Sequence, residues 1–312
     1  MFETLIIPVI SYGCQVWIHN TQLFKLISAG QLLAKGKDSL KKIATDAVER
    51  LHLKLIKWTL RLNRRAANLP CWGDSGRFPI VIKLLKQSFN YYQRLEQLNV
   101  TNSPHLVRHA FAEQRNLKLP WYSAWERYIS NLKLDGVPSA TSITASSKHM
   151  FEDLWLSAVT TSSKLQFYTT VKKHIGFEPY LSVPILKHRQ AVAKLRSSNH
   201  KFNRETGRYM KNRSNVDDEQ GTWSKSCKIC SGVDAELLCH LPFFNAILED
   251  EHHILVSCPL YHHVRVSLND HIKSAIVTWD PGPLMTLFND SNINSFAWYV
   301  HRIFVTRFPK RD

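Results

Sequence analysis

Residues 46–65 read DAVERLHLKLIKWTLRLNRR, and this pattern predicts an amphipathic α-helix. Apolar residues recur at intervals of three and four, which places them on one face of a helix. They are Val48, Leu51, Leu55, Trp58 and Leu62. Thr45 or Asp46 is suited to cap this helix, and Glu49 lies in its first turn. We expect the apolar residues to form its buried face.

A second stripe of the same helix carries only cations. Its members also recur at intervals of four and three, and Arg65 lies beside them. They are Arg50, Lys54, Lys57, Arg61 and Arg64. A solvated helix face usually mixes the two signs of charge, so a wholly basic face favours contact with phosphates. A basic surface without a ligand is the alternative.

Helical patterns continue beyond this segment. The polar stretch 63–79 is expected to end the first helix, and Pro79 suits the first turn of another. That helix should bury Ile80, Leu84, Ser88, Tyr91 or Tyr92, and Leu95. The Ser/Thr/Ala-rich run 139–147 has little periodicity and is interpreted as a flexible joint. An apolar rhythm returns from Phe151, so the expected fold class is mainly α.

The first eighteen residues are apolar, but they carry Glu3, Pro8 and Gly13 instead of a basic leader. We interpret them as a buried strand or helix turn and not as a signal peptide. No stretch approaches the roughly 18 uninterrupted apolar residues of a membrane span. The expectation is a soluble nuclear or cytoplasmic protein with no membrane partner.

The overall charge is strongly basic. Lys and Arg number 41 against 25 acidic residues among 312, a net charge of +16. Such a balance makes nucleic acid the leading partner class, with a merely basic soluble protein as the alternative. The apolar content of 44% suffices for two or three compact units. Six cysteines are too sparse for a disulfide scaffold, which favours a reducing compartment.

Most of the excess charge lies between Lys164 and Arg213, where twelve residues are basic and only Glu178 and Glu205 are acidic. Aromatic rings alternate with these cations, and we expect one or two of the rings to contact a base. The residues of this segment that we predict to bind nucleic acid are Lys172, Lys173, Lys194, Arg196, His200, Arg204 and Arg208.

The clearest chemical motif is a set of three cysteines and a histidine near the C-terminal end. Cys227 and Cys230 are two residues apart, and His253 and Cys258 follow. Zinc prefers tetrahedral nitrogen and sulfur ligands, and four protein ligands leave no position for a substrate, so we predict a structural zinc site. The nearby charge is acidic, which indicates that other segments supply the binding surface.

The gap between the two halves of this motif leaves the ligand set open. Twenty-two residues separate Cys230 from His253. Loop-closure entropy grows slowly with length, whereas a structural zinc ion contributes on the order of 10 kcal/mol, so the site tolerates a long gap. Three further residues are competing ligands, and a chain without metal is another alternative. The competitors are Cys239, His240 and His252.

Four blocks of the sequence resemble, in order, the region that follows the polymerase core in reverse transcriptases of non-LTR (LINE-class) retrotransposons. The first block is FETLIIPVISYGCQVW at 2–17, and the second is GRFP at 76–79. The third comprises FEPYL at 177–181, KLRSSNH at 194–200 and ETGR at 205–208. The fourth is the cysteine and histidine motif, with EDE at 249–251 and PLY at 259–261.

This resemblance implies a helical thumb and linker bundle, then a small zinc knuckle that holds RNA template or target DNA, then a C-terminal helical segment. It implies that Cys227, Cys230, His253 and Cys258 are the zinc ligands, and that other retroelement proteins are partners. The expected regions are 1–135 (thumb-like), 136–150 (flexible joint), 151–222 (basic linker), 223–265 (zinc knuckle with an unusual insertion) and 266–312 (C-terminal helices).

The chain departs from that family where catalysis is concerned. The polymerase fingers and palm lie upstream in the family, and no aromatic-x-Asp-Asp turn occurs here; Asp217 and Asp218 lie in a polar loop. Nucleotidyl transfer needs carboxylates that hold Mg²⁺ at the substrate phosphates. We therefore expect a non-catalytic nucleic-acid-binding remnant or fragment. The alternatives are a zinc-stabilised protein-interaction scaffold and a fragment of an active RNA-directed DNA polymerase.

Overall fold

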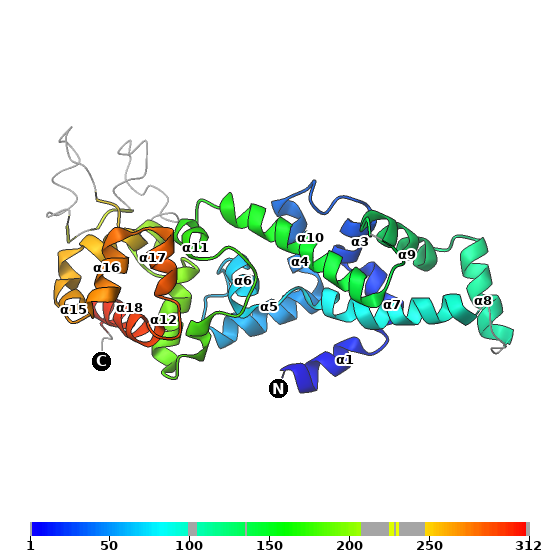
Figure 1. The fold of residues 1–312 in the computed structure, drawn as a ribbon, viewed down its shortest axis with the longest axis horizontal. Helices are drawn as coiled ribbons and strands as arrows, with labels where there is room; N and C mark the ends of the chain where they lie inside the picture. Colours follow the sequence, from blue (N-terminus) through cyan, green and yellow to red (C-terminus); the bar gives the residue numbers. More distant parts are fainter. Residues whose placement is uncertain are drawn as a thin grey trace. The chain divides into compact units, whose positions relative to one another are not determined.

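The protein is described by a computed structural model that covers residues 2–98, 105–134, 136–206, 225–227, 229–230 and 247–309. Within these ranges the fold is mainly helical, as predicted, and an antiparallel bridge pairs Ser226 with Leu248 (Figure 1). The chain divides into two compact units, Met1–Ile56 with Cys71–Thr161, and Lys57–Pro70 with Ser162–Asp312. No helix in the described part is long and apolar enough to cross a membrane.

The first unit is built from helices of the N-terminal half of the chain. The last residues of α5 and the first residues of α6 belong to segment 57–70, which is part of the second unit. The elements of the first unit are the π-helical turn η1 (Phe2–Ile6), α1 (Ile7–Ser11), α2 (Cys14–Trp17), the 3₁₀ turn η2 (Ile18–Asn20), α3 (Gln22–Ser28), α4 (Lys37–Thr45), α5 (Ala47–Thr59), α6 (Leu69–Ser75), α7 (Ile80–Leu98), α8 (His105–Asn116), α9 (Pro120–Asn131) and α10 (Ala140–Thr160). In this unit α7 packs along α10, and α3 packs against α9.

Aromatic rings fill the core of the first unit. Phe24 of α3 stacks on Tyr128 with ring centroids 4.2 Å apart and meets the edge of Trp125 at 4.9 Å. Phe89 of α7 lies 5.6 Å from the same tryptophan, so α3, α7 and α9 share one aromatic cluster. Rings at these spacings bury large apolar areas and fix the mutual positions of the helices.

The helix α7 matches its prediction. Ile80, Leu84 and Leu95 are buried, as is Tyr92 in place of the alternative Tyr91. Three- and four-residue spacing therefore located this apolar face correctly.

The helix α5 exists where predicted, but its buried face is different. Leu51 and Trp58 are 45% and 69% exposed, whereas the buried residues are Glu49, His52, Leu53 and Ile56. The Glu49 carboxylate accepts hydrogen bonds from the Trp72 indole at 2.7 Å and the Ile80 backbone N–H at 2.8 Å. These donors replace the water that the buried charge loses, so the polar side of the helix can face inward.

The same helix ends earlier than predicted, because a Schellman motif closes it after Thr59. The Leu62 N–H donates to the Lys57 carbonyl at 2.9 Å, and the Arg61 N–H donates to the Trp58 carbonyl at 3.1 Å. Arg61 occupies the left-handed position of this motif, with φ of 52°, where glycine is usual. The predicted cationic stripe therefore leaves the helix at this turn.

The predicted flexible joint at 136–150 is wrong, because α10 begins at Ala140. Ser139 and Ser142 form a reciprocal capping box at its first turn. Ala140, Ile143 and Ser147 are buried along its first half, and the Ser147 hydroxyl lies 2.8 Å from the Tyr128 hydroxyl within the core. The chain passes between the compact units instead after Ile56, Pro70 and Thr161.

The N-terminal segment is helical but not buried as predicted. Val9 is 74% exposed and Tyr12 is 87% exposed, while Cys14 and Ile18 are buried against the rest of the unit. Gly13 lies between α1 and α2 and has a φ of 63°, which glycine adopts readily. The chain can therefore change direction between the exposed and the buried part.

The second unit is also helical. Its elements are α11 (Gln166–Val171), η3 (Pro179–Ser182), α12 (Leu186–Arg196), α13 (Asn203–Thr206), the π-helical turn η6 (His253–Ser257), the 3₁₀ turn η7 (Pro259–Tyr261), α15 (His262–Val266), α16 (Asp270–Thr278), α17 (Pro281–Thr286) and α18 (Ile293–Arg307). The helices α12 and α18 pack against each other, and α16 packs against α17.

Candidate metal centre and the predicted cationic surface

The antiparallel bridge between Ser226 and Leu248 brings the two halves of the cysteine and histidine motif together. The Cys227 N–H donates to the Ile247 carbonyl at 2.8 Å, and the Glu249 N–H donates to the Lys225 carbonyl at 2.9 Å. These bonds hold segments 225–227 and 247–249 side by side. The long gap between Cys230 and His253 therefore does not separate the ligands.

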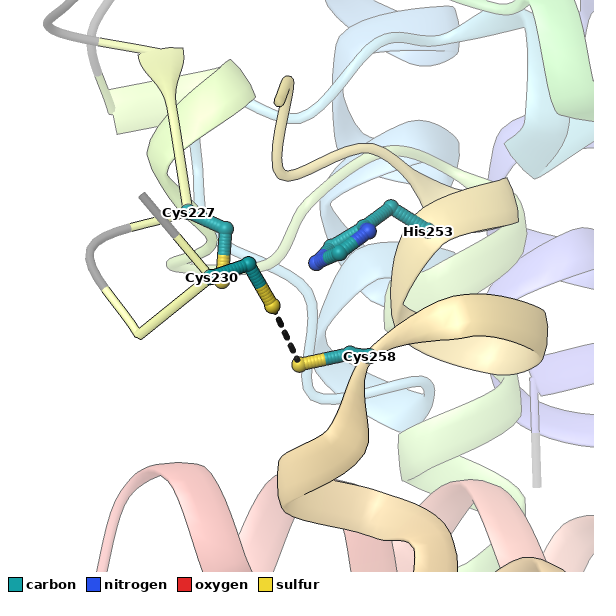
Figure 2. Close-up of side chains that lie close together, drawn as sticks. All are labelled: Cys227, Cys230, His253 and Cys258. Carbon is teal, nitrogen blue, oxygen red and sulfur yellow. Dashed lines mark hydrogen bonds between the residues drawn. The ribbon is translucent and has the colours of Figure 1, made fainter. Parts of the chain in front are cut away.

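Cys227, Cys230, His253 and Cys258 form one compact group, which we call the metal quartet (Figure 2). The sulfur atoms and the imidazole nitrogen lie within 4.8 Å of one another. His253 projects from η6, and Cys258 follows the same turn, where its N–H donates to the His253 carbonyl at 2.8 Å. The quartet can hold a metal ion, and it consists of the four predicted residues.

The sulfur chemistry of the metal quartet suits a cation. The Cys230 and Cys258 sulfurs are 3.7 Å apart, well beyond the 2.05 Å or so of a disulfide bond. A hydrogen bond with the Cys258 thiol lowers the pKa of the Cys227 thiol, and the same bond raises the pKa of Cys258. One thiolate is thereby stabilised within the group even before a cation adds its own attraction.

The orientation of the His253 imidazole also suits a metal ligand. Its ring points toward the cysteine sulfurs in Figure 2, and its Nε2 is buried without a hydrogen bond to any described residue. Buried polar atoms normally have a partner, so this nitrogen fits a metal ligand. The backbone around it is held separately, since the His253 N–H donates to an Asp250 carboxylate oxygen at 2.8 Å.

The structure separates one competing ligand from the quartet. His252 is exposed and meets the Trp279 ring edge-on, with ring centroids 4.8 Å apart. Cys239 and His240, the other two competitors, lie outside the described residues.

The acidic residues beside the motif that the structure describes have partners from the same unit. The Glu249 carboxylate lies 2.9 Å from an Arg307 guanidinium nitrogen, and Asp250 lies 2.9 Å from Arg204. Glu251 accepts a hydrogen bond from the Ser198 hydroxyl at 2.9 Å and lies 3.2 Å from the His200 imidazole. Two residues predicted to bind nucleic acid, His200 and Arg204, thus contact internal carboxylates.

Two other predicted nucleic-acid-binding residues are buried in what we call the Glu178 cluster, which consists of Lys172, Glu178 and Arg196. The Lys172 ammonium donates to one Glu178 oxygen, and the Arg196 guanidinium lies 3.3 Å from the other. Arg196 also lies over the Phe288 ring, 4.5 Å from its centroid. Both cations are almost fully buried, which contradicts the expectation that they form a surface for phosphates.

The remaining predicted cations have varied surroundings. Lys57 donates to the Ala66 carbonyl at 2.6 Å and so closes the turn after α5, while Lys194 is half-buried. Arg208 lies outside the described residues, as do Asp217 and Asp218. Among the predicted nucleic-acid-binding residues, those that are exposed and have no carboxylate partner in the described ranges are Arg50, Lys54, Arg61, Arg64, Arg65 and Lys173.

Sequence reasoning passed over Lys187, Lys201 and His301, which line a cavity together with Lys194 and Arg61. The signal that points to them is the seven-residue interval between Lys187 and Lys194, which places both on one face of α12. Their common location depends on contacts that are distant in sequence, and a count of charges does not contain this information.

Comparison with known proteins does not assign a family to this chain. The sequence matches no protein-family model, no curated protein and no solved structure. The structure itself shows two things. The chain is mainly helical, and three cysteines and one histidine form a group that can hold a metal ion.

Proposed function

We propose that this chain is a non-catalytic nucleic-acid-binding protein whose second unit is stabilised by one zinc ion in the metal quartet. The convergence of four ligand atoms from segments 227–230 and 253–258 is the observation that carries the proposal. Nucleic acid as the partner rests on the net charge of +16 and on the exposed cations without carboxylate partners.

The donor set favours zinc among the metals. Three sulfurs and one imidazole nitrogen are soft and borderline ligands, which suit zinc better than calcium or magnesium. With Zn–S bonds of about 2.3 Å, two sulfurs of a tetrahedral site are about 3.8 Å apart. The Cys230 and Cys258 sulfurs, at 3.7 Å, already match that separation. Four protein ligands would fill the coordination sphere, so the ion would be structural and not catalytic.

Native mass spectrometry tests the zinc proposal. We expect one zinc ion per chain before treatment with a chelator and none afterwards. Cys258→Ser should remove the zinc, whereas Cys14→Ser, which changes a buried cysteine outside the quartet, should retain it. A chain that carries no zinc after purification and none after incubation with zinc would contradict the proposal.

The resemblance to the thumb and linker of LINE-class reverse transcriptases supports RNA or DNA as the ligand. On this proposal the chain is a remnant or a fragment of such an element and holds template RNA or target DNA. The proposed absence of catalysis has its own test, a primer-extension assay on an RNA template with Mg²⁺. Extension by the purified chain would contradict a non-catalytic role.

Fluorescence anisotropy with a labelled single-stranded RNA tests the binding itself, with DNA of the same sequence as a comparison. We expect the logarithm of the binding constant to fall with the logarithm of salt concentration, with a slope of roughly −0.7 for each phosphate neutralised. Lys54→Glu and Arg64→Glu together should weaken binding about tenfold or more. The charge-matched control is Lys41→Glu with Lys42→Glu on α4. No binding at low salt would favour a protein-interaction scaffold.

A further inference from the structure

The second unit contains a cavity of about 600 Å³, which we call the basic cavity. One wall is a face of α12 that includes Lys187 and Lys194, and another is a face of α18 that includes Phe304. Arg61 and Lys201 contribute from two loops. All of the lining residues belong to the second unit, and the volume lies within the 300–1,000 Å³ or so of small-ligand sites.

Two hydrogen bonds in the surrounding loops hold the cavity in shape. The Asn63 N–H donates to the Asn199 side-chain oxygen at 2.7 Å, which joins the loop after α5 to the loop after α12. The loop after α12 is itself a Schellman turn, in which the Asn199 N–H donates to the Lys194 carbonyl at 2.9 Å. The cations on these loops are therefore positioned by backbone structure.

The charge of the basic cavity is uncompensated. Four side chains that line it are cationic, and no carboxylate lines it within the described ranges. None of the four, Arg61, Lys187, Lys194 and Lys201, forms an ion pair with a described residue. Burial, together with the positive charge of Lys201, lowers the pKa of the Lys194 ammonium. Like charges gathered in a concave site create a potential that attracts an anion.

This arrangement differs from the other cations of the same unit. Lys172 and Arg196 share Glu178, and Arg204 faces Asp250, so these cations have partners from their own chain. Lys194 lies on the same helix as Arg196 but has no such partner. An external anion would supply the counter-ion that Lys194 does not have within the described residues.

Aromatic rings form the apolar part of the basic cavity. Phe304 and Phe308 are four residues apart and therefore lie on the same side of α18 and its C-terminal end. Phe202 supports both of them, with ring centroids 5.2 Å and 5.5 Å away. Phenylalanine rings beside lysines are the combination that nucleic-acid-binding proteins use for bases and their phosphates.

We propose that the basic cavity is a nucleotide-binding pocket, in which Lys187, Lys194 and Lys201 hold a phosphate ester and Phe304 and Phe308 contact the base. The inference rests on the proposed function for the source of the nucleotide, which we take to be one unit of a bound RNA or DNA strand. The pocket would anchor that unit, while exposed cations elsewhere contact the strand without reading its bases.

Isothermal titration of the full zinc-loaded chain tests the pocket with defined probes. The probes are adenosine 5′-monophosphate, ribose 5-phosphate, inorganic phosphate and adenosine, all at equal ionic strength. We expect the monophosphate to bind one per chain, more tightly than ribose 5-phosphate because only the former has a base to contact the rings. Adenosine should bind weakest, since it lacks the anion. No binding of the monophosphate at millimolar concentration would overturn the proposal.

Substitutions locate the binding. Lys194→Gln with Lys201→Gln should weaken binding of the monophosphate about tenfold or more, because each removes a charge-assisted bond to the phosphate. Lys273→Gln is the control, since this lysine of α16 belongs to the same unit and does not line the basic cavity. Should the double variant fail to fold, the exposed Lys187→Gln provides the same measurement. Binding that is equal in the wild type and in these cavity variants would overturn the proposal.

A competition experiment separates this proposal from the broader one. We expect the monophosphate to compete with the labelled RNA, and the cavity variants to bind the RNA more weakly. RNA binding that neither competitor nor variants affect would overturn the pocket as a subsite for the strand while leaving nucleic-acid binding intact. Binding of the monophosphate without any binding of RNA or DNA would support the nucleotide pocket and overturn the proposed function.

Discussion

The Glu178 cluster and the metal quartet are two buried polar groups of the same unit, and they are satisfied in different ways. Glu178 receives both of its cations from the chain, so its carboxylate needs no external counter-ion. The quartet brings three sulfurs and an unpartnered His253 nitrogen together with no internal cation among the described residues that would complete it. The contrast favours a structural role for the Glu178 carboxylate and an external cation for the metal quartet.

The prediction with the largest expected effect concerns the metal quartet. Removal of zinc should lower the free energy of unfolding of the second unit by several kcal/mol, because structural zinc sites contribute on the order of 10 kcal/mol. Denaturation in urea with and without chelator measures the change. Cys258→Ser should make the chain insensitive to added zinc, whereas Cys14→Ser should remain sensitive. Identical unfolding curves for the wild type with and without zinc would show that the metal quartet, like the Glu178 carboxylate, needs no external cation.

The second prediction concerns the Glu178 cluster. Glu178→Gln leaves Lys172 and Arg196 buried without their shared carboxylate, which should lower the free energy of unfolding by about 3–5 kcal/mol. The measurement is urea denaturation of the zinc-loaded chain. Asp290→Asn, at an exposed position of the same unit, is the control and should change stability by less than about 0.5 kcal/mol. A comparably small effect of Glu178→Gln would show that the cluster is not required for stability.

The third prediction extends the comparison to the basic cavity. Arg61 adopts a left-handed φ of 52°, which costs a residue with a Cβ about 1 kcal/mol relative to glycine. Arg61→Gly should therefore raise the free energy of unfolding by up to about 1 kcal/mol, although it removes a cation from the cavity. Thermal unfolding of Arg61→Gly and Arg61→Val gives the test, because the β-branched residue should destabilise the turn. An equal response to both would exclude the backbone as the cause.

The smallest expected effect concerns the pH dependence of stability. Burial and Lys201 lower the pKa of Lys194 in the folded chain below its ordinary value of 10.5. The unfolded chain therefore binds more protons between the folded and the unfolded pKa, and stability should rise as the pH increases through that interval. Lys194→Met should remove this rise and add a few tenths of a kcal/mol at neutral pH, since the group is only half-buried. Urea denaturation at pH 7 and pH 10 measures both.

The fold class was predictable from sequence, but the environment of individual helix faces was not. The apolar face of α7 followed the regular spacing of Ile80 and Leu84. In α5, Glu49 is buried because Trp72 donates to it from another helix, and this partner lies 23 residues away. Only the first half of α10 escaped prediction, because the small residues Ala140 and Ser147 supply part of its buried face there and give no strong apolar period.

The candidate site was also predictable only in part. The metal quartet was predictable, since few other functions explain cysteines and histidine at those spacings. The cationic surface was predictable only in part, because burial depends on counter-ions that are remote in sequence. Asp250, for example, is 46 residues from Arg204. Charge count alone did not distinguish Arg196, which is enclosed by aromatic rings, from Lys194, which lines a cavity.

The bridge between Ser226 and Leu248 has a consequence for how this chain can vary. It holds residues 225–227 beside residues 247–249, so the approach of the two ligand-bearing segments does not depend on the length of the chain between Cys230 and Ile247. Insertions and deletions there should be tolerated while the bridge is preserved, because a longer loop adds little closure entropy. The position is therefore a natural place for sequence drift, and a suitable one for inserting an epitope or a fluorescent domain.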